Sequence, residues 1–123
     1  MYILDTSAFI EIIKNTKKCQ KICDKLGEVP AAITVFTLNE LLIGAEKKEK
    51  QIIEKLIQGI TILNFDKESA MKSVEIERYL TKQGKKINKV DLFIASICLV
   101  QQKIIVTLDN HFLRIPGLKT LKI

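Results

Sequence analysis

The chain is poor in several residue types, and it contains no long apolar run. No stretch approaches the length of a membrane span, and a short strand-like segment stands where a signal peptide would begin, so we expect a soluble, cytoplasmic protein. The three cysteines are odd in number, and Cys19 and Cys23 are spaced as neighbours on a helix, so no disulfide framework is expected. Aromatic residues make up only 6% of the chain, which leaves few rings on which nucleic-acid bases can stack.

The chain does contain enough apolar residues for one core. Its 123 residues are 47% hydrophobic, and without repeats, low-complexity tracts or linkers they predict a single domain over residues 1–123. Lysine and arginine outnumber aspartate and glutamate by 20 to 14, which gives a net charge of +6. This surplus favours polyanionic partners, with RNA or DNA first and acidic membrane surfaces second.

Short apolar runs alternate with segments of helical periodicity along the whole chain. The expected strands are Tyr2–Leu4, Ala31–Thr34, Ile60–Phe65, Ile104–Thr107 and Leu118–Ile123. The expected helices are 8–14, 18–26, a third from Thr34 or Thr37 to about Lys48, and then 50–58, 67–82 and 89–102. This alternation predicts an α/β fold, with a central parallel sheet of four to five strands and helices on both faces.

Four acids far apart in the chain, Asp5, Glu40, Asp91 and Asp109, each lie where a strand ends or a helix begins. In a parallel sheet these positions meet at one edge, the edge where open α/β folds bind ligands. Carboxylates gathered in one pocket repel each other unless a cation holds them, so the pattern predicts a divalent metal. Metal in turn suggests phosphate chemistry.

Each acid also has an ordinary structural explanation when it is taken singly. Asp5 can cap a helix, and residues 37–40 match a capping box in which Glu40 bonds back to the Thr37 amide. Asp91 suits a helix start, and Asp109 can close a turn. Capping does not explain why acids recur at the one edge. For Asp66, which also follows a strand, capping is the interpretation we keep.

Five segments along the chain resemble, in order and spacing, the signatures of the PIN-domain nucleases: LDTSA at 4–8, TLNEL at 37–41, DLFIAS at 91–96, TLDNHF at 107–112 and RIPGL at 114–118. The similarity covers essentially the whole chain and extends to the small toxins of VapBC-type toxin/antitoxin pairs. It implies a three-layer α/β/α sandwich. Ser96 and Cys98 replace the alanine usual in the family, and both are expected in a buried helix, where they bear on packing.

The resemblance also implies a site. Asp5, Glu40, Asp91 and Asp109 would hold Mg²⁺ or Mn²⁺, as one or two ions. The side chains expected to orient these carboxylates, with simple capping and turn formation an equal alternative, are Thr6, Ser7, Thr107 and Asn110. The lysines that lead into the helix of Asp91, and that are candidates for contact with RNA phosphates, are Lys85, Lys86 and Lys89.

The implied function is a metal-dependent endoribonuclease that hydrolyses RNA phosphodiester bonds, using water activated by the metal. The implied role is that of a toxin, with a small antitoxin and a homodimer as partners. Contacts for these partners are expected from Ile10, Ile13, Ile52, Ile53 and Ile57, although core packing explains most of them equally well.

Several alternatives remain open. An RNA-processing or decay nuclease would share this site, and so would a PIN-like scaffold that only binds RNA. A signalling receiver domain also carries acids and Mg²⁺ at strand ends, but it needs an acidic pair before Asp5 and a lysine after a late strand, which the chain lacks. We interpret His111, the only histidine, as a solvated surface residue, and Phe112 as an anchor in the core.

Overall fold

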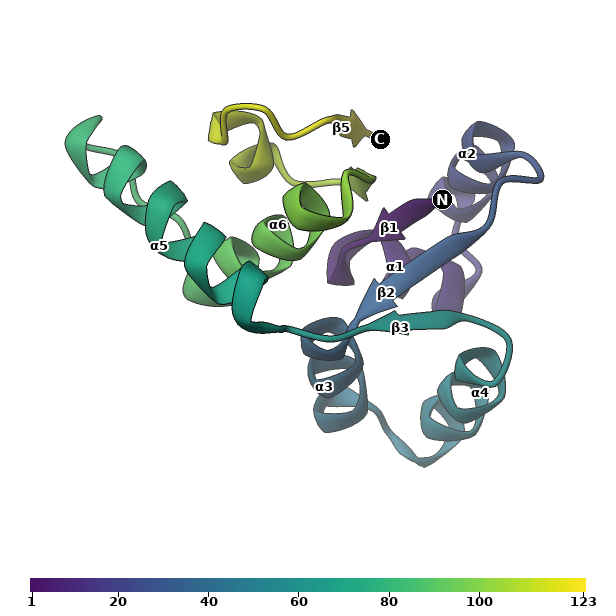
Figure 1. Ribbon diagram of the computed structural model, residues 1–123. Coiled ribbons are helices and arrows are strands. Elements are labelled where there is room, and N and C mark those ends of the chain that lie inside the picture. Colours follow the sequence, from purple (N-terminus) through teal and green to yellow (C-terminus); the bar gives the residue numbers. More distant parts are fainter.

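The computed structural model describes residues 1–123 as five strands, six α-helices and one 3₁₀-helix (Figure 1). In chain order the elements are β1 (Tyr2–Leu4), α1 (Thr6–Lys14), α2 (Lys17–Leu26), β2 (Ala31–Thr34), α3 (Val35–Gly44), α4 (Lys47–Ile57), β3 (Thr61–Leu63), α5 (Lys67–Lys82), α6 (Lys89–Gln101), β4 (Ile104–Thr107), η1 (Asn110–Arg114) and β5 (Thr120–Lys122).

All five strands form one parallel sheet in the order β3-β2-β1-β4-β5. The parallel sheet predicted from the sequence is therefore confirmed. Strand β1 is central, and the chain adds β2 and β3 on one side of it before it crosses to add β4 and β5 on the other. The carboxyl ends of β1 and β4 thus flank the point where the winding reverses, the place where open α/β sheets bind ligands.

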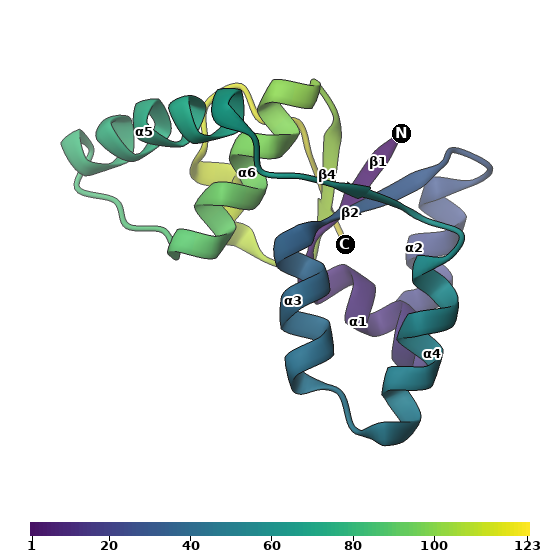
Figure 2. The same cartoon turned by 60° about the horizontal axis from the view of Figure 1, so that its bottom comes forward.

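The core lies on both faces of this sheet. Successive strand residues point to opposite faces: Ile3 and Ile105 belong to a buried cluster with α5 and α6, whereas Leu4 and Val106 belong to a second cluster with α1, α2, α3 and α4. Figures 1 and 2 show these two groups of helices on opposite sides of the strands. The result is the three-layer α/β/α sandwich expected from the sequence.

Two predictions about helix boundaries were wrong. Helix α3 ends at Gly44 and α4 begins at Lys47, because Ala45 and Glu46 adopt extended backbone angles and separate the two helices. The predicted capping box at residues 37–40 does not form either. Thr34, one of the two helix starts expected from the sequence, caps α3 by accepting a hydrogen bond from the Thr37 amide at 3.3 Å. Glu40 therefore lies inside the helix.

Other structural predictions are confirmed. Asp66 caps α5 by accepting a bond from the Ser69 amide at 2.8 Å. Phe112 is fully buried, as an anchor should be, and so are Ser96 and Cys98.

None of the helices combines the length and apolar character that crossing a membrane would require.

Candidate active site

Asp5 is the most buried of the four acids and is held by three neighbours. It follows β1 and caps α1, with Oδ1 accepting bonds from the Ala8 amide at 2.9 Å and from the Ser7 hydroxyl at 2.7 Å. Oδ2 accepts a bond from the Thr107 hydroxyl at the end of β4. Burial raises the pKa of the Asp5 carboxyl above its ordinary value, although these three hydrogen bonds oppose the rise.

Thr107 and Ser7 connect the ends of β1 and β4. The Thr107 hydroxyl, which donates to Asp5, also accepts a bond from the Asp109 amide at 2.9 Å. The Ser7 hydroxyl accepts from the Leu108 amide at 3.1 Å. Each hydroxyl therefore uses its proton on a carboxylate and a lone pair on the backbone after β4. The two strand ends, with their acids, are fixed relative to each other.

Glu40 reaches the site from the middle of α3. Its side chain is exposed, and Oε1 accepts a hydrogen bond from the Thr6 hydroxyl at 3.0 Å. Thr6 lies in the first turn of α1, directly after Asp5. This bond therefore connects Glu40 to the residue next to Asp5. The Thr6 oxygen also lies 3.2 Å from the Thr37 hydroxyl on α3. Glu40 thus pairs with Thr6, not with the Thr37 amide of the predicted capping box.

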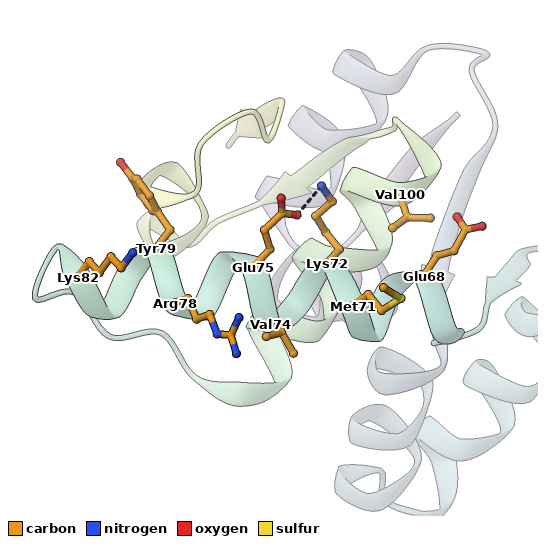
Figure 3. Close-up of a pocket in the computed structure, with 9 residues that line it drawn as sticks. All are labelled: Glu68, Met71, Lys72, Val74, Glu75, Arg78, Tyr79, Lys82 and Val100. Carbon is orange, nitrogen blue, oxygen red and sulfur yellow. Dashed lines mark ion pairs between the residues drawn. The ribbon is translucent and has the colours of Figure 1, made fainter.

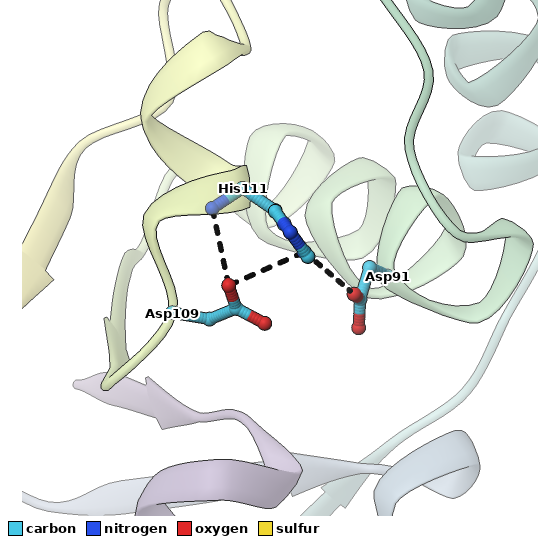
Figure 4. Close-up of side chains that lie close together, drawn as sticks. All are labelled: Asp91, Asp109 and His111. Atoms are coloured by element: carbon cyan, nitrogen blue, oxygen red, sulfur yellow. Dashed lines mark hydrogen bonds and ion pairs between the residues drawn. The ribbon is translucent and has the colours of Figure 1, made fainter.

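Asp91 occupies the first turn of α6, which Asn88 caps through bonds from the amides of Val90 and Asp91 at 2.8 and 3.3 Å. The helix dipole favours an anion at this position. The Asp91 side chain is 25% exposed, and it lies close to Asp109 and His111 (Figure 4).

The pKa of Asp91 responds to its burial and to the charges of the other acids. Burial contributes most to raising this pKa to about 6. The charges of three other carboxylates raise it further, those of Asp109, Asp5 and Glu40 in decreasing order, and His111 acts in the opposite direction. All four predicted acids therefore lie on one side of the fold, near enough for the charges of the other three to act on Asp91.

Asp109 and His111 form the other side of the site (Figure 4). Asp109 caps η1 by accepting a bond from the His111 amide at 3.3 Å, which is the turn-closing role expected from the sequence. The His111 ring then lies against the acids, with Nδ1 3.2 Å from Asp109 Oδ1 and 3.9 Å from Asp91 Oδ2. His111 is exposed, as predicted. Its ring nevertheless lies against the acids of the site, whereas we had interpreted His111 as a solvated surface residue.

The remaining predicted site residues differ in their placement. Thr6, Ser7 and Thr107 contact the carboxylates as expected, whereas Asn110 is exposed and its side chain has no hydrogen bond to them. Lys85 and Lys86 are exposed in the loop before α6. Lys89 is tied to the Glu77 carboxylate, with Nζ 2.7 Å from Oε2.

One hollow of the surface lies away from the acids. It has a volume of about 940 Å³ and runs along the outer side of α5 (Figure 3), where the residues that line it are Glu68, Met71, Lys72, Val74, Glu75, Arg78, Tyr79, Lys82 and Val100. None of the site residues predicted from the sequence lines this hollow. It is a feature of a surface separate from the acidic site.

The fold and the site together define a class: α/β proteins that carry a cluster of carboxylates at the carboxyl edge of a parallel sheet, at its switch point. Comparison with known proteins narrows this class to one family. The family model described as PIN domain matches residues 2–118. The chain belongs to the PIN-domain family, which confirms the resemblance seen in its sequence motifs.

Relatives match the chain over most of its length. The tRNA(fMet)-specific endonuclease VapC of Shigella flexneri is 31% identical, covering 97% of this chain and 95% of the relative. Ribonuclease VapC3 of Methanocaldococcus jannaschii is 38% identical, covering 77% of this chain and 95% of its own. Among solved structures, DNA-bound VapBC from Salmonella typhimurium contains a chain that matches with a TM-score of 0.85 and 25% identity, over 98% of this chain and 96% of that one.

Proposed function

We propose that this protein is a metal-dependent endoribonuclease of the VapC kind, the toxin of a toxin/antitoxin pair. The observation that carries the proposal is the gathering of four carboxylates at the carboxyl edge of the sheet, where Thr107 connects Asp5 with Asp109 and Thr6 holds Glu40. The relatives that match the chain over most of its length are named as ribonucleases and endonucleases. Four carboxylates whose charges oppose one another suit a site that a divalent cation neutralises.

The donor set fits Mg²⁺ or Mn²⁺, both of which bind carboxylate oxygens. Asp5, Glu40, Asp91 and Asp109 are the residues that would hold one or two ions. When bound, the metal supplies positive charge at the scissile phosphate and lowers the pKa of a water nucleophile.

The protein's own part in the reaction is to hold the four carboxylates in position before the substrate binds. Ser7 and Thr107 fix both oxygens of Asp5, and Thr6 fixes Glu40. Asp91 and Asp109 stand at the starts of a helix and of a 3₁₀-helix, so their backbones do not move freely. A preorganised site of this kind costs little reorganisation when the transition state forms.

The substrate side of the proposal rests on charge. Lys85 and Lys86 are exposed in the loop that leads into α6, and Arg114 holds this loop by donating from Nη1 to the Lys86 carbonyl at 2.9 Å. We assign Lys85 and Lys86 to the phosphates that flank the scissile bond. Lys89 takes a lesser part in this contact, because its ammonium is already paired with Glu77.

The proposed antitoxin contact is a small hollow of about 130 Å³ between α1, α3 and α4. Its apolar lining includes Ile10, Ile13 and Ile53, and Glu40 also lines it. A segment bound there would therefore touch both an apolar surface and one acid of the site. Such a partner can block the enzyme without a large interface.

The proposed homodimer contact is the hollow along α5 (Figure 3). It exposes Met71 beside Glu68 toward one end of the helix, Tyr79 beside Lys82 toward the other, and Val74 between them. Two α5 helices packed in antiparallel orientation would place apolar side chains together and pair Glu68 with Lys82 at both ends.

Cleavage of end-labelled RNA in Mg²⁺, Mn²⁺ or EDTA tests the enzymatic proposal. We expect internal cleavage with either metal and none in EDTA, and equal cleavage in EDTA contradicts it. Binding of RNA without any cleavage would indicate the alternative of a binding scaffold. An RNA-processing role without toxicity is separated by expression in a bacterial host, where a toxin arrests growth and its Asp5→Asn variant does not.

A further inference from the structure

His111 places a nitrogen donor at a site whose other candidate ligands are all oxygens. One ligand atom from each of Asp91, Asp109 and His111 can be chosen so that all three atoms lie within 4.8 Å of one another (Figure 4). We propose that His111 Nδ1 binds the divalent cation alongside Asp91 and Asp109, and that this nitrogen shifts the preference of the site from Mg²⁺ toward Mn²⁺. The inference rests on the metal site of the proposed function.

The distances suit a shared cation. Metal bonds of about 2.1 Å in octahedral geometry place neighbouring ligand atoms about 3.0 Å apart and opposite ones about 4.2 Å apart. Nδ1 lies 3.2 Å from Asp109 Oδ1, close to the distance for neighbouring ligands, and 3.9 Å from Asp91 Oδ2, close to the distance for opposite ones. A cation can enter between the three atoms with only small side-chain movements.

The backbone holds the ring in this position. Asp109 accepts a bond from the His111 amide, and Phe112, the next residue, is fully buried. The start of η1 is therefore anchored in the core and capped by one of the proposed ligands. The ring itself is 47% exposed, which leaves the site open to water and substrate.

The chemistry of imidazole gives the expected selectivity. Mg²⁺ keeps oxygen ligands, whereas nitrogen donors suit transition metals. A site with one imidazole should thus favour Mn²⁺ more strongly than a site of carboxylates alone. The competing explanation is that His111 only forms an ion pair with the acids, in which case a cation would displace the ring.

The sequence makes the test direct, because His111 is the only histidine in the chain. Pulsed EPR of Mn²⁺ bound to the full chain, purified without a polyhistidine tag, detects coupling to a directly bound imidazole nitrogen. We expect this coupling in the wild type. Any such signal must come from His111.

His111→Asn is the informative variant, because the asparagine amide oxygen can take the place of Nδ1 and so replaces a nitrogen ligand with an oxygen ligand. We expect the nitrogen coupling to disappear and the ratio of Mn²⁺ to Mg²⁺ affinity, measured by calorimetry, to fall about tenfold. The control is Leu113→Asn, an exposed position on the same 3₁₀-helix, which should change neither result.

The outcomes separate this inference from the proposal on which it rests. Mn²⁺ bound tightly without nitrogen coupling, or with the same affinity ratio in His111→Asn, overturns the role of His111 and leaves the carboxylate site standing. Failure of the wild type to bind either metal at millimolar concentration overturns both.

Discussion

The Thr107 hydroxyl donates a hydrogen bond to Asp5 Oδ2 across 102 positions of sequence, and it accepts one from the amide of Asp109. A single buried hydroxyl thus connects two acids that come from the ends of neighbouring strands. Thr107 is fully buried, so no water can substitute for either bond without a rearrangement. The geometry of the acidic site depends on this residue as well as on the acids.

Replacing Thr107 with valine keeps the shape of the side chain and removes both bonds. We expect the free energy of unfolding to fall by about 1–3 kcal/mol, because Asp5 loses a buried partner. We also expect Mn²⁺ affinity to fall roughly 10- to 100-fold, as is typical when the support of a ligand is lost. Urea unfolding and calorimetric titration measure the two effects. Thr107→Ser retains the hydroxyl and should keep most of the stability and most of the Mn²⁺ affinity. If the serine variant lost as much of either as the valine variant, the hydrogen bonds would not be the cause.

Replacing Asp91 with asparagine should stabilise the metal-free protein at neutral pH. The pKa of Asp91 is raised to about 6 in the folded state, so the folded state binds its proton more tightly than the unfolded state does. Stability that this proton provides is present below about pH 4 and is lost as the pH rises through 6. Because the side chain is partly solvated, the gain in Asp91→Asn at pH 7.5 is about 1–2 kcal/mol.

Thermal unfolding in EDTA measures this effect, and the pH dependence is its internal control. At pH 7.5 the variant should melt a few degrees above the wild type, and near pH 4 the two should coincide. Added Mn²⁺ should stabilise only the wild type. An Asp91→Asn variant that is less stable than the wild type in EDTA at pH 7.5 would show that the carboxylate is not under repulsion.

The features that follow from the direction of the chain were predictable from the sequence. Once strands and helices alternate, parallel pairing of the strands brings Asp5 and Asp109 to the same edge of the sheet, so the order of elements alone predicts that they meet. The same holds for Asp66, whose cap is local. These predictions use only the order of elements and the chemistry of single residues.

The interpretations of Glu40 and His111, which depended on an exact helix boundary and on a distant contact, were wrong. The capping box assigned to Glu40 looked sound locally, but β2 ends at Thr34, which caps the helix first. The actual partner of Glu40, Thr6, lies 34 positions earlier in the chain. His111 shows the same limit, because only the path of η1 determines that its ring faces Asp91.

The lysines before α6 should contribute to RNA binding through charge alone. Replacing both Lys85 and Lys86 by glutamine should weaken RNA binding similarly for different RNA sequences. The slope of log affinity against log salt concentration should become shallower by about the amount that two phosphate contacts contribute. Fluorescence anisotropy at several salt concentrations measures both. The matched control replaces Lys17 and Lys18, which are exposed on α2. An equal loss in the two double variants would mean that net charge, not this loop, attracts RNA.

The proposed dimer contact makes a prediction about α5. Met71 is 64% exposed in the hollow, so Met71→Asp should leave the fold intact and shift the protein from dimer to monomer, because it buries a charge at an apolar contact. Light scattering after size-exclusion chromatography measures the mass. Ile43→Asp serves as the control, since Ile43 is 77% exposed on α3, outside the hollow. A monomeric wild type, or a dimer that survives Met71→Asp, contradicts the proposed contact.

The most direct test of the acidic site compares two aspartates that both follow strands and cap helices. Asp5 belongs to the coupled carboxylates, whereas Asp66 only caps α5, and asparagine preserves a helix cap in either place. The measurement is the rate of cleavage of end-labelled RNA by Asp5→Asn and Asp66→Asn in the presence of Mn²⁺. We predict that Asp5→Asn loses at least about 100-fold in rate while Asp66→Asn retains wild-type activity. A fully active Asp5→Asn enzyme would contradict the assignment of catalysis to this site.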